Sequence, residues 1–82
     1  MNNLNETIEL MNSPDYKERF KAEYYQLKIR TEKLDAMVEK YEKGKLDFTP
    51  SCPLWLLAGQ LISMRVYLEH LEKRAEIEKV EL

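Results

Sequence analysis

The chain has 82 residues, of which 34% are charged, with a net charge of −2 and a single cysteine. A chain of this length forms one domain that buries only about 60% of its unfolded surface, and a lone cysteine excludes an intrachain disulfide, so self-association is the expected source of further stability. The nearly balanced charge argues against bulk binding to DNA or RNA, which requires a strong positive excess.

The N-terminal residues 1–12 are polar and rich in Asn, with a weak apolar set. We expect an extension that is either frayed or a short helical turn docked on a neighbour. The triplet Ser13, Pro14 and Asp15 then predicts the start of a helix, because Ser accepts from free N–H groups, Pro fits the first helical position, and Asp favours the positive end of the dipole. A single domain is therefore predicted over residues 13–82.

The first long helix is predicted over about residues 14–43, where neither Gly nor Pro interrupts the chain. Its apolar positions step alternately by four and three residues, which is a heptad seam. Gly44 is the predicted stop, with lysines at the negative end of the dipole. The seam consists of Phe20, Tyr24, Leu27, Thr31, Leu34, Val38 and Tyr41.

Residues 44–52 are the predicted connection, with Thr49 or Ser51 capping a second helix over about residues 53–79 and Pro53 in its first turn. The segment after the last seam residue is acidic, and we expect it to fray. The second helix carries a matching seam of Leu57, Leu61, Met64, Leu68, Leu71 and Ala75.

A second apolar row lies beside the seam of the second helix. A hairpin of two helices covers one face only, so this row requires a further partner. Gly59 costs about 1 kcal/mol relative to Ala within a helix, which indicates that a neighbouring backbone or a ligand comes close there. The predicted fold is all-α: an antiparallel hairpin of two long helices that assembles into a homo-oligomeric bundle. The second row consists of Trp55, Ala58, Ile62 and Val66.

Residues that carry catalytic chemistry are sparse. His70 has no adjacent Cys and no Ser-centred motif, and the Glu-x-x-His spacing of di-iron bundles would need Glu where Tyr67 stands. No Gly-rich phosphate loop or paired-cysteine motif is present. The sequence therefore predicts a protein that is not an enzyme, with no catalytic residue, no metal site and no cofactor.

The stretch from Asp15 to Lys33 combines six basic residues with four acidic ones and holds four of the eight aromatic residues. A Tyr ring can stack on a nucleobase while Lys or Arg meets phosphate, which suits a small phosphorylated ligand. The alternative interpretation is that the aromatic residues belong to the seam and the cations are solvated. The residues that share one helical face are Lys17, Lys21, Tyr24 and Lys28.

A leucine pattern in the second helix, L-L-x-x-Q-L-x-x-M-x-x-Y-L-x-x-L, begins at Leu56 and ends at Leu71. Together with the first long helix, it resembles a family of short phage and prophage proteins described as crAss-phage-related. The resemblance covers most of residues 13–77.

The layout is also similar to the phage anti-CBASS sponge proteins, small helical hexamers that sequester the cyclic di- and trinucleotides used as alarm signals by bacterial immune systems. The shared features are a Tyr near the start (Tyr16), an apolar-Lys step (Leu27-Lys28) and a Trp-Leu-x-x-Gly turn ending at Gly59. The resemblance implies that Tyr16 stacks on a base and that Lys28 meets phosphate, with Arg30 as an alternative cation. The family has an Arg after the glycine, where this chain has Gln60, so a trinucleotide site requires that Arg65 supply the missing charge.

Two hypotheses result. The first is a phage-encoded homo-oligomer, with a hexamer as the expected state, that sequesters cyclic di- or trinucleotides or related nucleotide signals. The second is a small helical oligomeric adaptor of a phage or prophage that binds another protein through the exposed apolar row. The predicted ligand-binding residues are Tyr16, Lys21, Tyr24, Lys28, Arg30, Gln60 and Arg65. The predicted interface residues are Tyr25, Ile29, Trp55, Gly59, Ile62 and Val66.

The cellular setting is predicted from the same features. The first residues lack the basic region and apolar core of a secretion signal, and no apolar run approaches the roughly 20 residues that span a bilayer. An unpaired thiol suits a reducing compartment. We therefore expect a protein of the host bacterial cytoplasm that has no membrane partner.

Overall fold

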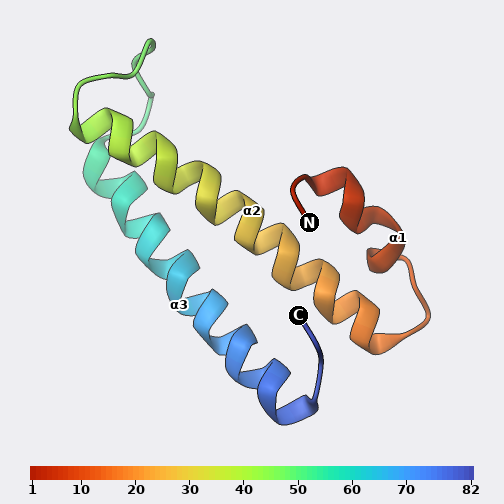
Figure 1. Ribbon diagram of the computed structural model, residues 1–82. Helices are drawn as coiled ribbons and strands as arrows, with labels where there is room; N and C mark the ends of the chain where they lie inside the picture. Colours follow the sequence, from red (N-terminus) through yellow and green to blue (C-terminus); the bar gives the residue numbers. More distant parts are fainter.

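The computed structural model describes residues 1–82 and contains helices and no strands, which confirms the all-α prediction (Figure 1). Two long helices dominate, and a short helical segment precedes them. None of the helices has the combination of length and apolar character needed to cross a membrane. In chain order the elements are the 3₁₀ helix η1 (Leu4–Thr7), α1 (Ile8–Met11), α2 (Tyr16–Glu42) and α3 (Leu54–Glu78).

Helices α2 and α3 lie side by side over most of their length, and the connection between them is at one end of the molecule (Figure 1). Their cross-contacts pair the start of α2 with the end of α3, as between Tyr16 and Glu78, and then the middle of each, as between Asp35 and Arg65. The two helices therefore run in opposite directions. The molecule is elongated, with extents of 43 × 25 × 16 Å.

The start of α2 differs by two residues from the prediction, and the helix is unbroken for 27 residues. Asp15 is the N-cap, and its carboxylate accepts from the Lys17 amide at 2.9 Å. The Ser13 hydroxyl accepts from the Asp15 amide at 3.0 Å, so Ser13 fixes the turn before the helix rather than capping it. Pro14 accordingly lies outside the helix.

Gly44 ends α2 as predicted, with a left-handed φ of +66°. The Lys45 amide donates to the Lys40 carbonyl at 2.8 Å, and the Gly44 amide donates to the Tyr41 carbonyl at 3.1 Å. This pair of bonds is the Schellman arrangement, which satisfies carbonyls left free at a helix end.

The start of α3 corrects the prediction of a side-chain cap. Pro53 is the N-cap residue, and no side chain caps the helix, so neither Thr49 nor Ser51 has that role. The Pro53 carbonyl accepts from the amides of Leu56 and Leu57 at 3.1 and 3.3 Å. Pro53 thus opens the helix through its backbone, in an extended conformation.

The end of α3 is ordered and folds back, where the sequence predicts fraying. Lys79 adopts a left-handed conformation (φ 57°, ψ 47°), and the Val80 amide donates to the Ala75 carbonyl at 2.9 Å. Val80 is then buried with Ala75 in the core. An apolar contact of this kind commonly accompanies a left-handed helix end.

The core lies where the beginning of α2 meets the end of α3. Every member of the two predicted seams is buried or half-buried, which confirms that these seams form the contact between the long helices. Tyr25, Leu27 and Leu68 pack against the buried cluster. That cluster consists of Phe20, Tyr24, Leu71, Ala75 and Val80.

The N-terminal segment is docked on α2, which decides between the two alternatives for residues 1–12 (Figure 1). Thr7 is fully buried, and its hydroxyl donates to the Leu4 carbonyl at 2.7 Å and accepts from the Gln26 amide at 2.9 Å. Ala22 and Ile29 flank Gln26 on the same side of α2, and both are buried. The segment therefore covers a second face of α2.

Candidate ligand-binding site

Tyr16 is held in a network at the end of the molecule opposite the connection. Its hydroxyl donates to Glu78 at 2.5 Å and accepts from the Arg74 guanidinium at 2.7 Å. Arg74 also donates to Glu78 at 3.0 Å and lies over the Phe20 ring, 4.9 Å from its centroid. The Tyr16 ring meets Phe20 edge-on and remains about half exposed. Tyr16 thus ties α2 to α3 and keeps one ring face accessible.

The charges of this network reinforce one another. The hydrogen bond from Tyr16 lowers the pKa of Glu78, and Arg74 lowers it further. The hydrogen bond to Glu78 raises the pKa of Tyr16, because it favours the protonated phenol. The same carboxylate raises the pKa of Arg74. At neutral pH the site is a neutral phenol between a full cation and a full anion.

Tyr24 lies in the core, where its position needs no ligand to explain it. It is 6% exposed, its hydroxyl donates to Glu72 at 2.9 Å, and its ring meets Tyr25 edge-on at 5.1 Å. Burial, followed by the hydrogen bond to Glu72, raises the pKa of Tyr24 to about 12. Neighbouring Lys21 is half-buried. In the single chain the Tyr24 ring is not available for stacking on a base.

Lys28 and Arg30 are exposed, and neither takes part in the ion pairs of the chain. Lys28 lies twelve residues after Tyr16, which is roughly 18 Å along a helix axis. The structure therefore does not bring Tyr16 and Lys28 together within one chain. The two unpaired cations remain free to meet an anion.

Gln60 and Arg65 are on α3. Arg65 forms an ion pair with Asp35 at 3.0 Å and so links the two long helices. Gln60 is exposed, and its amide approaches the Met64 sulfur at 3.9 Å. No hydrogen bond or ion pair joins either of them to Lys28 or Arg30, and Tyr24 is in the core, so the predicted ligand residues do not form a single site in one chain.

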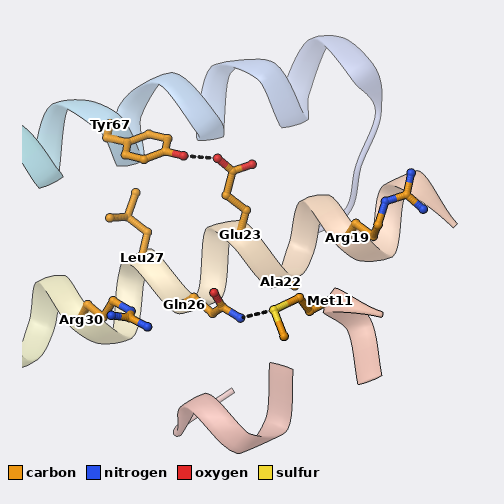
Figure 2. A pocket seen from close by; sticks show the side chains of 8 residues that line it. All are labelled: Met11, Arg19, Ala22, Glu23, Gln26, Leu27, Arg30 and Tyr67. Carbon is orange, nitrogen blue, oxygen red and sulfur yellow. Dashed lines mark hydrogen bonds between the residues drawn. The ribbon is translucent and has the colours of Figure 1, made fainter. Parts of the chain in front are cut away.

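A groove that the sequence did not reveal lies between the N-terminal segment and the long helices, with a volume of about 320 Å³ (Figure 2). The side chains that line it are Met11, Arg19, Ala22, Glu23, Gln26, Leu27, Arg30 and Tyr67. Only Arg30 was among the predicted ligand residues. The sequence does hold one clue to this groove: Ala22 and Ile29 are small or apolar and lie on one side of α2, which indicates a second packed face of that helix.

The polar groups of the groove are arranged along α2 (Figure 2). Arg19 donates to the Ser13 carbonyl at 2.9 Å, and its other N–H groups have no partner in the chain. Arg30 takes part in no ion pair. Glu23 accepts a hydrogen bond from Tyr67, which raises the pKa of that tyrosine. Gln26 donates to Thr7 and to the Met11 sulfur. Two guanidinium groups against one carboxylate leave the groove positive.

Three of the four residues of the second apolar row are exposed on the outer face of α3, whereas Ala58 is half-buried. Trp55, Ile62 and Val66 are 74%, 60% and 44% exposed. A Cβ added at Gly59 would meet nothing within 4 Å, so no part of the chain approaches this glycine. The single chain therefore does not itself provide the partner that the sequence pattern predicts for this row. Ile29, predicted to face another copy, is instead buried within the chain, and Tyr25 packs on the core.

The family model described as Sequestin matches residues 14–77, which is 64 of the 82 residues. The chain belongs to the Sequestin family. No curated protein and no solved structure matches it. The Sequestin match covers α2, the connection and nearly all of α3, so it includes the groove side chains of α2 and the exposed apolar row.

The residue types most often used in metal binding and nucleophilic catalysis do not cluster in this chain. No set of three or more His, Cys, Asp or Glu residues is placed to hold a metal ion. Cys52 is exposed in the connection. The Nδ1 atom of His70 lies 2.9 Å from the Val66 carbonyl of its own helix.

Proposed function

We propose that this Sequestin binds and sequesters a nucleotide-type signal without turning it over. The observation that carries the proposal is the family match over residues 14–77, because the family name denotes sequestration. The likeness of Tyr16, Lys28 and the Trp55–Gly59 turn to the anti-CBASS sponges points the same way. On this proposal the protein is phage-encoded and acts in the host cytoplasm. There it counters an anti-phage defence by removing a cyclic di- or trinucleotide or a related nucleotide.

The groove of Figure 2 supplies groups suited to such a ligand. A guanidinium such as that of Arg30 binds phosphate in a bidentate manner. The Gln26 carbonyl oxygen remains available as an acceptor for a base edge, because the amide nitrogen makes both of its hydrogen bonds. Glu23 can accept from sugar hydroxyls, and Met11 offers an apolar surface. The volume of about 320 Å³ lies at the lower end of ligand pockets.

We propose that the active form is a homo-oligomer joined through the exposed row of α3, with a hexamer as the expected state. Trp55 and Ile62 are large and exposed, and the open space at Gly59 lets another backbone approach closely. Tyr16 and Lys28 lie roughly 18 Å apart along α2, so they do not meet within one chain. In an oligomer, Tyr16 of one copy and Lys28 of another would form a shared site.

Thermal unfolding with a panel of cyclic di- and trinucleotides tests the proposal. A ligand present at 100 times its Kd stabilises by about 2.7 kcal/mol, which for a domain of this size raises the Tm by roughly 10 °C or more. Native mass spectrometry of protein from cells that produce these nucleotides then reports the retained molecule and the number of subunits. Unchanged melting with the whole panel at high excess would remove the nucleotide proposal.

The second candidate function is a helical adaptor that binds another protein, and the exposure of Trp55 and Ile62 favours it. The variants Lys28→Ala and Arg30→Ala separate the two, because both side chains are exposed and unpaired and their loss leaves the fold intact. If the protein sequesters a nucleotide, these variants should form the normal oligomer but should no longer bind the nucleotide. The adaptor predicts that these variants are harmless and that Trp55→Ala abolishes function.

A further inference from the structure

A second hollow lies at the opposite end of α2, where the connection folds against the helix. It has a volume of about 410 Å³ and shares no lining residue with the groove. Its polar lining is three lysines and one aspartate, Lys33, Lys40, Lys45 and Asp47, although the whole chain has a net charge of −2. The three ion pairs of the structure use other cations, so these lysines are unpaired.

The backbone holds the three lysines toward one hollow. Lys33 and Lys40 are seven residues apart, which places them on the same face of α2 about 10.5 Å apart along the axis. Lys45 is brought back beside them by the turn at Gly44, whose hydrogen bond joins the Lys45 amide to the Lys40 carbonyl at 2.8 Å. The lysines therefore converge because of how α2 ends, and three ammonium groups facing one space favour an anion with several charges.

An exposed aromatic ring completes the lining. Phe48 is 54% exposed although it is large and apolar, and it shares the hollow with half-buried Leu46 and Met37. A ring of this kind can stack on a nucleobase, and the neighbouring Asp47 carboxylate can accept from sugar hydroxyls or base N–H groups. The negative end of the α2 dipole accounts for a lysine near the helix end, but it does not account for the exposed ring.

We infer that this hollow is a second binding site, for a nucleotide that carries two or more phosphates. Lys33, Lys40 and Lys45 hold the phosphate chain, and Phe48 stacks on the base. The inference is independent of sequestration in the groove, because the two sites share no residue.

Calorimetric titration at low salt with ATP and with inorganic pyrophosphate tests the site. Saturable binding of one ATP per chain is expected. The double variant Lys33→Gln/Lys40→Gln weakens both probes by on the order of tenfold or more, because two charge-assisted contacts to the phosphates are lost. Phe48→Ala weakens ATP and leaves pyrophosphate unchanged. The matched control, Lys73→Gln/Lys79→Gln, removes the same charge from α3 and its end and binds as the wild type does.

Three results would overturn the inference: no saturable binding of ATP, an equal loss in the control and the test variant, or an equal effect of Phe48→Ala on both probes. The first two mean that the lysines are a solvated surface, and the third means that the ring takes no part. Melting curves of each variant show that the fold is retained. Sequestration in the groove is judged separately, by the cyclic nucleotide panel.

Discussion

Lys79 has the only left-handed backbone among the non-glycine residues of the chain. Its side chain contributes nothing to the turn that requires this conformation, whereas its carbonyl accepts from Lys17 at 3.2 Å. The conformation turns the chain back after α3 and brings Val80 into the core. A left-handed conformation is costly for residues with a Cβ and nearly free for glycine.

Lys79→Gly is therefore expected to raise the free energy of unfolding by about 1 kcal/mol, measured by urea denaturation. Lys73→Gly is the matched control, because it makes the same exchange at an exposed position inside α3 and is expected to lower stability by about 1 kcal/mol. A loss of stability in both variants would contradict the prediction.

Tyr24 gives the fold a dependence on alkaline pH. Its pKa is about 12 in the folded chain, against 10.0 ordinarily, because burial and Glu72 disfavour the phenolate. The stabilisation is complete below the unfolded pKa and is lost as the pH rises through the folded one. We expect the free energy of unfolding to fall between about pH 10 and 12, and Tyr24→Phe to make that fall shallower. Urea denaturation across this range would show an identical slope in both proteins if Tyr24 played no part.

At the scale of elements, the N-terminal segment has one fully buried side chain, that of Thr7. Thr7 links η1 to α2 through Gln26, and Gln26 in turn reaches Met11 in α1. Nothing else in a segment of eight helical residues, η1 and α1 together, is fully buried. Because the groove needs this segment as one of its walls, the groove depends on this contact.

Thr7→Val keeps the shape of the side chain and removes the hydroxyl. It removes the side-chain hydrogen bond to the Leu4 carbonyl and takes one acceptor from Gln26. We expect a loss of about 1–3 kcal/mol, together with faster hydrogen exchange in residues 4–11 than in α2. Thr49→Val, an exposed exchange of the same kind, should stay within about 0.5 kcal/mol. Equal effects of the two variants would show that the Thr7 hydroxyl is not what docks the segment.

At the scale of the whole molecule, the elongated pair of helices hides its seams and leaves the outer row of α3 uncovered. Three of its four residues are exposed, none of them is charged, and no other part of the chain lies near the adjacent Gly59. A small chain that leaves such a face in water has an apolar surface suited to another molecule.

Ile62→Glu is expected to dissociate the proposed assembly into single chains of 9.8 kDa, because it puts a carboxylate in the middle of the row. Ile62 is 60% exposed, so the single chain should retain its helix content. Ile77→Glu makes the same exchange at another exposed isoleucine, near the end of α3 and outside the row, and should keep the wild-type mass. Sedimentation measures both, and a wild-type protein that sediments as a single chain would contradict the prediction.

The sequence predicted the parts of the fold that local pattern dictates. Alternating steps of four and three residues identified both seams, and Gly44 identified the end of α2, because these signals depend on near neighbours alone. The docking of Thr7 on Gln26 spans nineteen residues and has no periodic signature. The burial of Val80 likewise depends on a left-handed Lys79, for which the sequence gives no cue.

The candidate site was harder to predict for the same reason. Cations and rings on α2 were recognised, but Tyr24 belongs to the core and Arg65 to an ion pair with Asp35. Which side of a helix meets solvent is decided by the partners of that helix. The groove gathers side chains from α1, α2 and α3, so Glu23 and Tyr67 become neighbours only after the chain has folded.

Trp55 is the only tryptophan of the chain, and it lies on the face that no other part of the chain covers. Indole emission moves to shorter wavelengths when water leaves its surroundings. The intrinsic fluorescence of this protein therefore reports occupancy of the outer face of α3, without a label and without interference from a second indole. A dilution series followed in a fluorimeter would give the dissociation constant of whatever occupies that face.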